Sequence, residues 1–256
     1  MKKIIPCIIL HLLSASLANV KSSSSVGPYL STVVYNEAGI MSESSVMTGL
    51  TGFYEIYDTY GLRLEGNLSS GETHYESNRT GSMEEIPEHH AELRSLLNKH
   101  YTDQKGFKYA PYVGLGYRYL DSNASNMYST TGHIGYDRQQ TYLYSPMGIE
   151  ITTPIRHSTP WHSTVGIEYD HFIHGNNESD TSFACGSPML FDQDSGYGYR
   201  LKARFNKKMD KRTLSIEPFY KYWHIQQSDT ANCRQRTYIE PENSSAELGV
   251  SFSYLF

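Results

Sequence analysis

The sequence predicts a membrane-spanning, antiparallel up-and-down β-barrel of ten strands, with eight or twelve strands as the neighbouring possibilities. Three observations support this fold class. Segments of about ten residues alternate apolar and polar side chains, which is the period of a strand with two different faces. The turn-rich connections between these segments alternate between short and long. The last segment carries Leu248, Val250, Phe252, Tyr254 and Phe256 at every second position.

Composition agrees with a barrel and excludes other classes. The chain has 256 residues, 22 of them Tyr, and a hydrophobic fraction of 38%. Its longest apolar run, residues 4–13, is too short to cross a bilayer as a helix, so a helical membrane protein is excluded. The formal net charge is −5, and it becomes −7 without Lys2 and Lys3. Because no basic tract is present, nucleic acid is not an expected partner.

Residues 1–18 have the organisation of a secretory signal peptide. Lys2 and Lys3 precede the apolar run, and Ser16-Leu17-Ala18 supplies small residues before a cleavage site. We therefore expect cleavage after Ala18, which leaves residues 19–256 as one barrel domain. The alternative is an uncleaved anchor helix, which the short apolar run disfavours.

The alternating segments can be placed along the whole mature chain. The clearest is 107–120, in which Tyr109, Val113 and Leu115 share one face. The least clear is 89–101, which also fits a short amphipathic helix. An even number of strands brings both termini to the same side of the membrane, and this favours a strand there. The ten segments are 26–36, 46–56, 60–75, 89–101, 107–120, 139–153, 160–173, 197–205, 213–225 and 246–256.

The connections predict the orientation of the barrel. Short periplasmic turns and long outer loops are typical of such proteins, so we expect extracellular loops and two periplasmic termini in the bacterial outer membrane. A secreted β-sandwich is the structural alternative, but it does not explain this alternation. The short connections are 57–59, 102–106, 153–159 and 206–212, and the long ones are 37–45, 76–88, 121–138, 174–196 and 226–244.

Two cysteines and two prolines add local expectations. Cys185 and Cys233 lie in neighbouring long loops, and an exported protein meets an oxidising compartment, so we expect a disulfide rather than two unpaired thiols. Pro111 and Pro218 fall inside strands and lack a backbone donor, which predicts a bulge at each. Glycines inside strands, such as Gly116, are expected either to relieve barrel curvature or to make room for large neighbours.

The charged faces of the strands are expected to point into the barrel. Their signs nearly balance, which favours an ion-pair network that plugs the narrow lumen over an ion-lined pore. One row is of like charge, Arg200, Lys202 and Arg204. Acids on the flanking strands are its expected partners, and a bound anion is the alternative. The expected lumen residues are Arg63, Glu65, Arg118, Glu150, Glu168, Asp170, Arg200, Lys202, Arg204, Glu217, Lys221 and Glu247.

The C-terminal segment resembles the closing strand of bacterial outer-membrane barrels, whose assembly machinery reads a terminal strand that ends in Phe. The resemblance implies an assembly signal formed by Val250, Phe252, Tyr254 and Phe256, with the barrel-assembly machinery and outer-membrane lipid as partners. The segments PYVGLGYRYL, YLYSPMG, GIEYDHFIHG and GYGYR also resemble a group of small Gram-negative outer-membrane barrels with no assigned activity.

Candidate catalytic residues do not form a convincing set. The strand number resembles that of omptins, outer-membrane proteases that use an Asp pair and an Asp-x-His pair. Here Asp170 and His171 are adjacent, so their side chains point to opposite faces of a strand. His162 and Ser163, considered with Glu168 as a deacylase-like site, have the same defect, and so do His157 and Ser158, which lie in a turn. Neither a phosphate-binding loop nor a zinc-ligand spacing is present, so we expect a protein that is not an enzyme, with no catalytic residue, metal or cofactor.

The favoured function is therefore a surface-exposed barrel that acts through its loops as an adhesin- or antigen-like protein, or has a structural role. Candidate contacts for an extracellular or host ligand are Tyr128, Tyr136, Phe183, Met189, Leu190 and Phe191. A narrow porin or small-solute channel is the first alternative. An outer-membrane hydrolase of omptin or deacylase type is the second.

Overall fold

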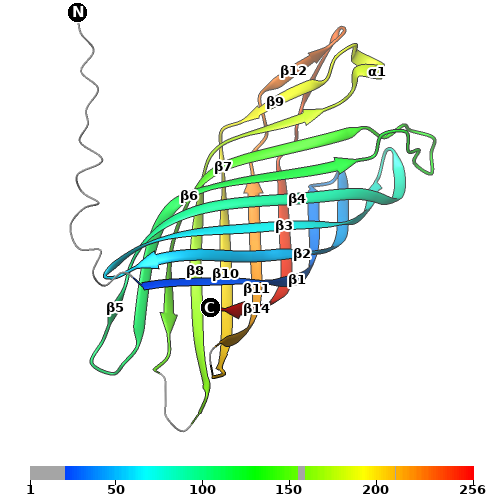
Figure 1. Ribbon diagram of the computed structural model, residues 1–256. Coiled ribbons are helices and arrows are strands. Elements are labelled where there is room, and N and C mark those ends of the chain that lie inside the picture. Colours follow the sequence, from blue (N-terminus) through cyan, green and yellow to red (C-terminus); the bar gives the residue numbers. More distant parts are fainter. Residues whose placement is uncertain (1–20, 155–158, 211) are drawn as a thin grey trace, which may run out of the picture.

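The computed structural model describes residues 21–154, 159–210 and 212–256 (Figure 1). The expected signal peptide, residues 1–18, lies outside them. Ten long strands form a closed antiparallel barrel, in which consecutive strands pair and the last strand returns to the first. They are β1 (Lys21–Glu37), β2 (Met41–Tyr57), β3 (Tyr60–Ser77), β4 (Gly81–Lys99), β6 (Lys108–Asn123), β7 (Asp137–Thr152), β8 (Trp161–Ser179), β10 (Gly196–Lys208), β11 (Thr213–Ile225) and β14 (Asn243–Leu255).

Short elements lie at the two ends of the barrel. We call the end that carries connections 38–40, 78–80, 124–136, 180–195 and 226–242 the loop end, and the opposite end the turn end. The loop end holds α1 (Ser182–Cys185), β9 (Met189–Gln193) and the hairpin of β12 (Thr230–Cys233) and β13 (Arg236–Ile239), while β5 (Tyr101–Thr102) lies at the turn end (Figure 1). Within the described residues, the structure has no helix long and apolar enough to cross a membrane.

Segment 89–101 is a strand over most of its length, as expected, but two of the predicted long loops are wrong. β1 and β2 pair continuously to Glu37 and Met41, and β3 and β4 pair to Ser77 and Gly81. The connections predicted at 37–45 and 76–88 therefore shrink to tight turns. Beyond the lipid a strand needs no apolar face, so the alternation fades while the backbone pairing continues.

The expected bulges at the two prolines are also wrong. Register shifts occur instead between Thr73 and Tyr75 and between Leu143 and Tyr144. The pairing of β4 with β6 ends at Tyr112, and that of β10 with β11 skips Glu217 and Pro218. Each proline thus lies at a gap in one ladder, where the missing N–H costs no hydrogen bond and no extra residue is needed.

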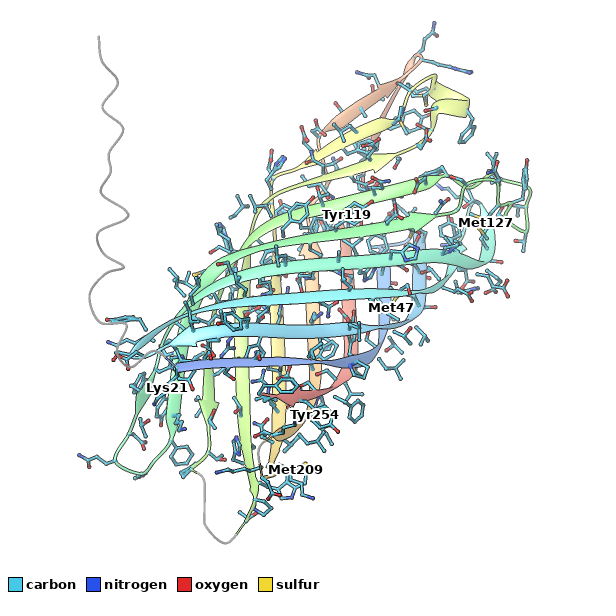
Figure 2. The ribbon with its side chains drawn as sticks, viewed as in Figure 1. Lys21, Met47, Tyr119, Met127, Met209 and Tyr254 are labelled. Atoms are coloured by element: carbon cyan, nitrogen blue, oxygen red, sulfur yellow. A yellow bond between two sulfur atoms is a disulfide. The ribbon has the colours of Figure 1, made fainter. Side chains whose placement is uncertain are left out.

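The apolar face of each strand points outward, as predicted. The side chains of Leu115, Ile167 and Phe252 are 58%, 57% and 46% exposed on the outside of the cylinder. They share no core, so the sandwich alternative is wrong. Figure 2 shows side chains projecting from both faces of the wall, with Lys21 near the turn end and Met127 at the loop end. The candidate assembly-signal residues Phe252, Tyr254 and Phe256 lie on this outer face, and Val250 is half-buried.

Candidate functional site

The turn-end half of the lumen is organised around Arg63 of β3. Its guanidinium lies 2.9 Å from the carboxylate of Glu150, 3.3 Å from that of Glu55 and 3.5 Å from that of Glu65. Lys202 reaches the same Glu150 at 2.5 Å. Because Glu150 is on β7 and Arg63 is on β3, this ion pair crosses the lumen. It joins two residues that are 87 positions apart in the chain. Arg63, Glu55 and Glu150 are buried, and each charge of the group has a partner of opposite sign.

The middle of the lumen is organised around Arg200 of β10. Its side chain lies 2.7 Å from Asp170, 3.0 Å from Glu168 and 2.5 Å from Glu92. Arg94 of β4 binds Glu168 from the opposite side of the barrel. Arg94 also lies 3.0 Å from Glu65, so the groups around Arg63 and Arg200 are parts of one network.

Acids on other strands neutralise the like-charged row of β10. Arg204 lies 2.6 Å from Glu217 on the adjacent strand β11. Nearby, Lys221 of β11 pairs with Glu247 of β14 at 3.1 Å. The row needs no bound anion for charge balance, because acids on other strands meet each of its members.

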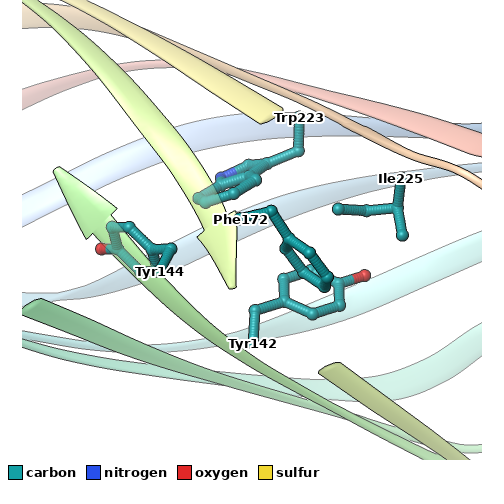
Figure 3. Packing of buried hydrophobic residues seen from close by; sticks show 5 residues of the cluster. All are labelled: Tyr142, Tyr144, Phe172, Trp223 and Ile225. Atoms are coloured by element: carbon teal, nitrogen blue, oxygen red, sulfur yellow. The ribbon is translucent and has the colours of Figure 1, made fainter. Parts of the chain in front are cut away.

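An aromatic layer lies on the loop-end side of this network, because its residues on β7, β8 and β11 stand nearer the loop end of their strands than Glu150, Glu168 and Glu217 do. Figure 3 shows its five side chains. The rings of Tyr144 and Trp223 meet edge to face with centroids 5.0 Å apart, and those of Tyr142 and Phe172 are 5.4 Å apart. The Tyr144 hydroxyl donates to Glu92 at 2.6 Å and accepts from Arg200 at 2.9 Å, so the layer is tied to the ion pairs. Its members are Tyr142, Tyr144, Phe172, Trp223 and Ile225, all nearly inaccessible to solvent.

Two glycines leave the space that the aromatic rings occupy. A Cβ atom on Gly116 would lie 2.2 Å from Cζ of Tyr144, and one on Gly198 would lie 3.0 Å from the Trp223 ring. No side chain fits at Gly116 while Tyr144 keeps its position. The expectation that Gly116 makes room for a large neighbour is correct.

A second polar cluster lies at the loop end, around Arg138 of β7. Its Nη2 atom donates to both oxygens of Glu43, at 2.9 and 2.8 Å. Its Nη1 atom lies 3.6 Å from Glu37 and 3.8 Å from Glu240. The Tyr35 hydroxyl lies 3.1 Å from Glu37 and 3.3 Å from Glu240. Burial, opposed by Arg138, and the nearby Glu37 raise the pKa of Glu240, in the connection before β14, to about 7.

A cavity of about 500 Å³ opens beside this cluster. All five loop-end connections and the strand ends next to them contribute to its lining. Its polar lining includes Glu37, Glu43, Arg138 and Glu240. Its apolar lining includes Ile40, Met41, Met83, Ile86, Ile134, Tyr136, Phe183, Met189, Phe191, Tyr238 and Ile239.

All twelve expected lumen residues point inward, but they differ in what they contact. Arg118 lies over the rings of Tyr142 and Trp223, 5.9 Å from each centroid. The sequence interpretation missed Glu55 and Glu92 as lumen charges. Glu55 lies between the outward-facing Tyr54 and Ile56, so its alternation could have revealed it. In strand register Glu92 shares the polar face of segment 89–101 with Arg94, so the same alternation could have revealed it.

The residues considered for catalysis do not come together. Asp170 is buried on the lumen side and His171 is exposed outside, as their adjacency requires. Ser163 contacts Thr153 at 3.4 Å, and the described contacts do not join it to His162. His157 and Ser158 lie outside the described residues. No cluster of His, Cys, Asp and Glu arranged for a metal ion occurs in the part of the chain that the structure describes.

One further lumen contact places an acid between a hydroxyl and a histidine. Glu88 lies 2.6 Å from Nε2 of His90 and accepts a hydrogen bond from the Thr73 hydroxyl. Both side chains therefore engage the carboxylate rather than each other. His90 is therefore not placed to take the Thr73 proton, and the carboxylate of Glu88 is the group that accepts the Thr73 hydrogen bond.

A disulfide joins Cys185 of α1 to Cys233 of β12, 48 residues later. The bond ties the connection between β8 and β10 to the connection between β11 and β14. These two connections carry Phe183, Tyr238 and Ile239, which line the cavity. The crosslink therefore limits how far two of its walls can separate.

No family model matches the chain, and no curated protein matches it. Among solved structures, the outer membrane protease OmpT from Escherichia coli superposes with a TM-score of 0.63 at 7% sequence identity, covering 93% of this chain and 97% of that one. The toluene transporter TodX from Pseudomonas putida gives a TM-score of 0.38 at 9% identity, over 91% and 89% of the two chains. The likeness to OmpT concerns the fold alone: this chain has the closed ten-stranded barrel fold of outer-membrane proteins.

Proposed function

We propose that this protein is an outer-membrane barrel with a filled lumen, and that its function is binding at the loop end. In this proposal the loop end is extracellular and both termini are periplasmic. The outward apolar rows support insertion in lipid, and the three long connections 124–136, 180–195 and 226–242, which all lie at the loop end, support the orientation. Loops held on a rigid scaffold are where binding function usually lies.

The observation that carries the proposal is the filling of the lumen. The aromatic layer lies in series with the network of Arg63, Arg94 and Arg200, so an ion would have to displace both. A cavity of about 110 Å³ beside the network, lined in part by Phe53 and Glu217, has room for several waters. This cavity does not open a path through the aromatic layer.

The loop end offers exposed apolar side chains for binding. Tyr128, Phe183 and Leu190 are each more than half exposed there. Phe191, another expected contact residue, is 3% exposed because it packs against the interior. Tyr136 is half covered and faces the cavity. The candidate binding surface thus includes a concave part as well as protruding side chains.

Conductance in a planar bilayer tests the filled lumen. We expect the purified protein to show no steady ion current. Truncation of the aromatic layer in a Tyr144→Ala, Phe172→Ala, Trp223→Ala variant is expected to produce discrete openings, because it removes one barrier and also the Tyr144 hydroxyl that holds Arg200 and Glu92 in the other. Tyr199→Ala is the matched control, because that ring is exposed on the outer face. Steady current through the unaltered protein would overturn the proposal and favour the narrow channel.

A further inference from the structure

The loop-end cavity has the size and composition of a small-molecule site. Its volume of about 500 Å³ lies in the range of roughly 300–1,000 Å³ that is typical of ligand pockets. Such pockets are mostly apolar and contain a few convergent polar groups. Here the apolar lining comes from several loop-end connections, including Met83, Ile134 and Phe191, and the charged groups gather around Arg138.

The charged groups of this cavity are not balanced. Three carboxylates, Glu37, Glu43 and Glu240, face the single guanidinium of Arg138. Arg138 gives its two hydrogen bonds to Glu43 and only approaches the other two. Glu37 and Glu240 are 6% and 7% exposed. The buried carboxylates of Glu37 and Glu240 thus share one cation, Arg138, whose hydrogen bonds already go to Glu43.

The same two carboxylates compete for one hydroxyl proton. Tyr35 lies within hydrogen-bond distance of both, but its hydroxyl can donate to only one of them at a time. In the described part of the chain, Glu37 and Glu240 therefore share a single hydroxyl donor and one edge of Arg138. A buried acceptor without a donor is costly, so the cluster is suited to take up another cationic donor.

We propose that this cavity binds a small amphiphilic cation, an amine or guanidine bearing an alkyl or aryl group, with its charge at Glu37 and Glu240 and its apolar part against the walls. The inference rests on the proposed function of the loop end as the binding face and names its ligand class. The charge complementarity of the carboxylates selects the cationic head. The apolar lining selects the body that the head carries. An anion is excluded because it would meet uncompensated carboxylates.

Isothermal titration with tryptamine tests the proposal. The full disulfide-bonded protein is placed in phosphatidylcholine nanodiscs at pH 7.5, and empty nanodiscs correct for partitioning into lipid. Two matched probes isolate the charge: tryptophol, which carries a hydroxyl in place of the amine, and indole-3-propionate, which is an anion. We expect saturable one-to-one binding of tryptamine and affinity for tryptophol at least ~10-fold lower.

Variants of the carboxylates locate the site. Glu37→Gln and Glu240→Gln each keep the side-chain size and are expected to weaken tryptamine binding at least ~10-fold. Glu242→Gln is the matched control, because Glu242 lies two residues away with a side chain that is 65% exposed. It is expected to leave the affinity unchanged. Retained heat-modifiable migration in electrophoresis confirms that each variant is folded.

Several results would overturn the proposal. Equal affinity for tryptophol would show that charge is not recognised, and preferential binding of indole-3-propionate would invert the expected selectivity. An equal loss in the Glu242→Gln control would place the effect outside the cavity, and the absence of saturable tryptamine binding would remove the site. Conductance is measured separately from tryptamine binding. A protein that conducts ions and still binds tryptamine would therefore contradict the proposed filled lumen but not the proposed binding site.

Discussion

Substitution of Arg200 by Met tests whether the lumen network stabilises the barrel. The guanidinium lies 2.7 Å from Asp170, 3.0 Å from Glu168 and 2.5 Å from Glu92, and its side chain is 9% exposed. Met has a similar length but no charge. Arg200→Met therefore leaves three neighbouring acids without their shared partner in the interior of the barrel.

The expected loss follows from this burial. Removing one partner of a buried ion pair costs about 3–5 kcal/mol, because the other charge stays buried without compensation. Arg94 still contacts Glu168, and Lys221 lies 4.0 Å from Glu92. Asp170, which has no measurable exposure, loses most. We therefore expect a decrease of about 3 kcal/mol in the free energy of unfolding.

The measurement is equilibrium urea unfolding of the refolded protein in lipid vesicles, followed by the fluorescence of Trp161 and Trp223. Arg79→Met is the matched control, since Arg79 is exposed in the turn between β3 and β4. Its effect is expected to stay within about 0.5 kcal/mol. Arg200→Met combined with Asp170→Asn should recover part of the loss, because it removes the stranded charge. A change below about 1 kcal/mol for Arg200→Met would refute the reasoning.

Three further predictions concern the outer face, the disulfide and Glu240. Leu115→Arg places a charge on the lipid side and should lower the free energy of unfolding in vesicles by about 2–4 kcal/mol, whereas Leu115→Phe should not lower it. Equal stability of the two variants would contradict the lipid-facing assignment. The double variant Cys185→Ser, Cys233→Ser should keep its heat-modifiable migration, but proteolysis of its β12–β13 hairpin should be faster. An unchanged cleavage rate would contradict a crosslink that restrains the loops. The raised pKa of Glu240, which faces Glu37, Glu43, Arg138 and Tyr35, means that the folded state binds its proton more tightly than the unfolded state. Its stabilising contribution is therefore complete below about pH 4.5 and is lost as the pH rises through about 7. Hydrogen exchange in the β12–β13 hairpin, corrected for the intrinsic rate, should therefore be faster at pH 8 than at pH 5.5. Glu240→Gln should remove this difference, and a difference that persists in the variant would contradict the assignment.

Much of the barrel could be predicted because alternation is a local property. Leu115 and Tyr117 face outward and Arg118 faces inward, as their spacing on one strand requires. The strand lengths could not be predicted in the same way. Residues such as Ser42 and Glu43 lie beyond the apolar band, and their strand conformation depends on pairing with β3.

The candidate site was less accessible to sequence reasoning. The lumen charges, Glu92 among them, could be recognised by their strand face, but the face does not show which acid meets which base. Arg138 and Glu240 lie beside turn-rich connections, where no period indicates which side chains point inward. The loop-end cavity depends on five connections that meet only after the barrel closes.

The sequence by itself determined which side of the wall each strand residue occupies, because the period of two assigns alternate side chains to opposite faces. Only the tertiary structure decided the partners. Arg63 meets Glu150 and Arg200 meets Glu92 across the lumen, through pairs that lie 87 and 108 positions apart in the chain. Closure and register bring these charges together, and neither is encoded in the local alternation of any one strand.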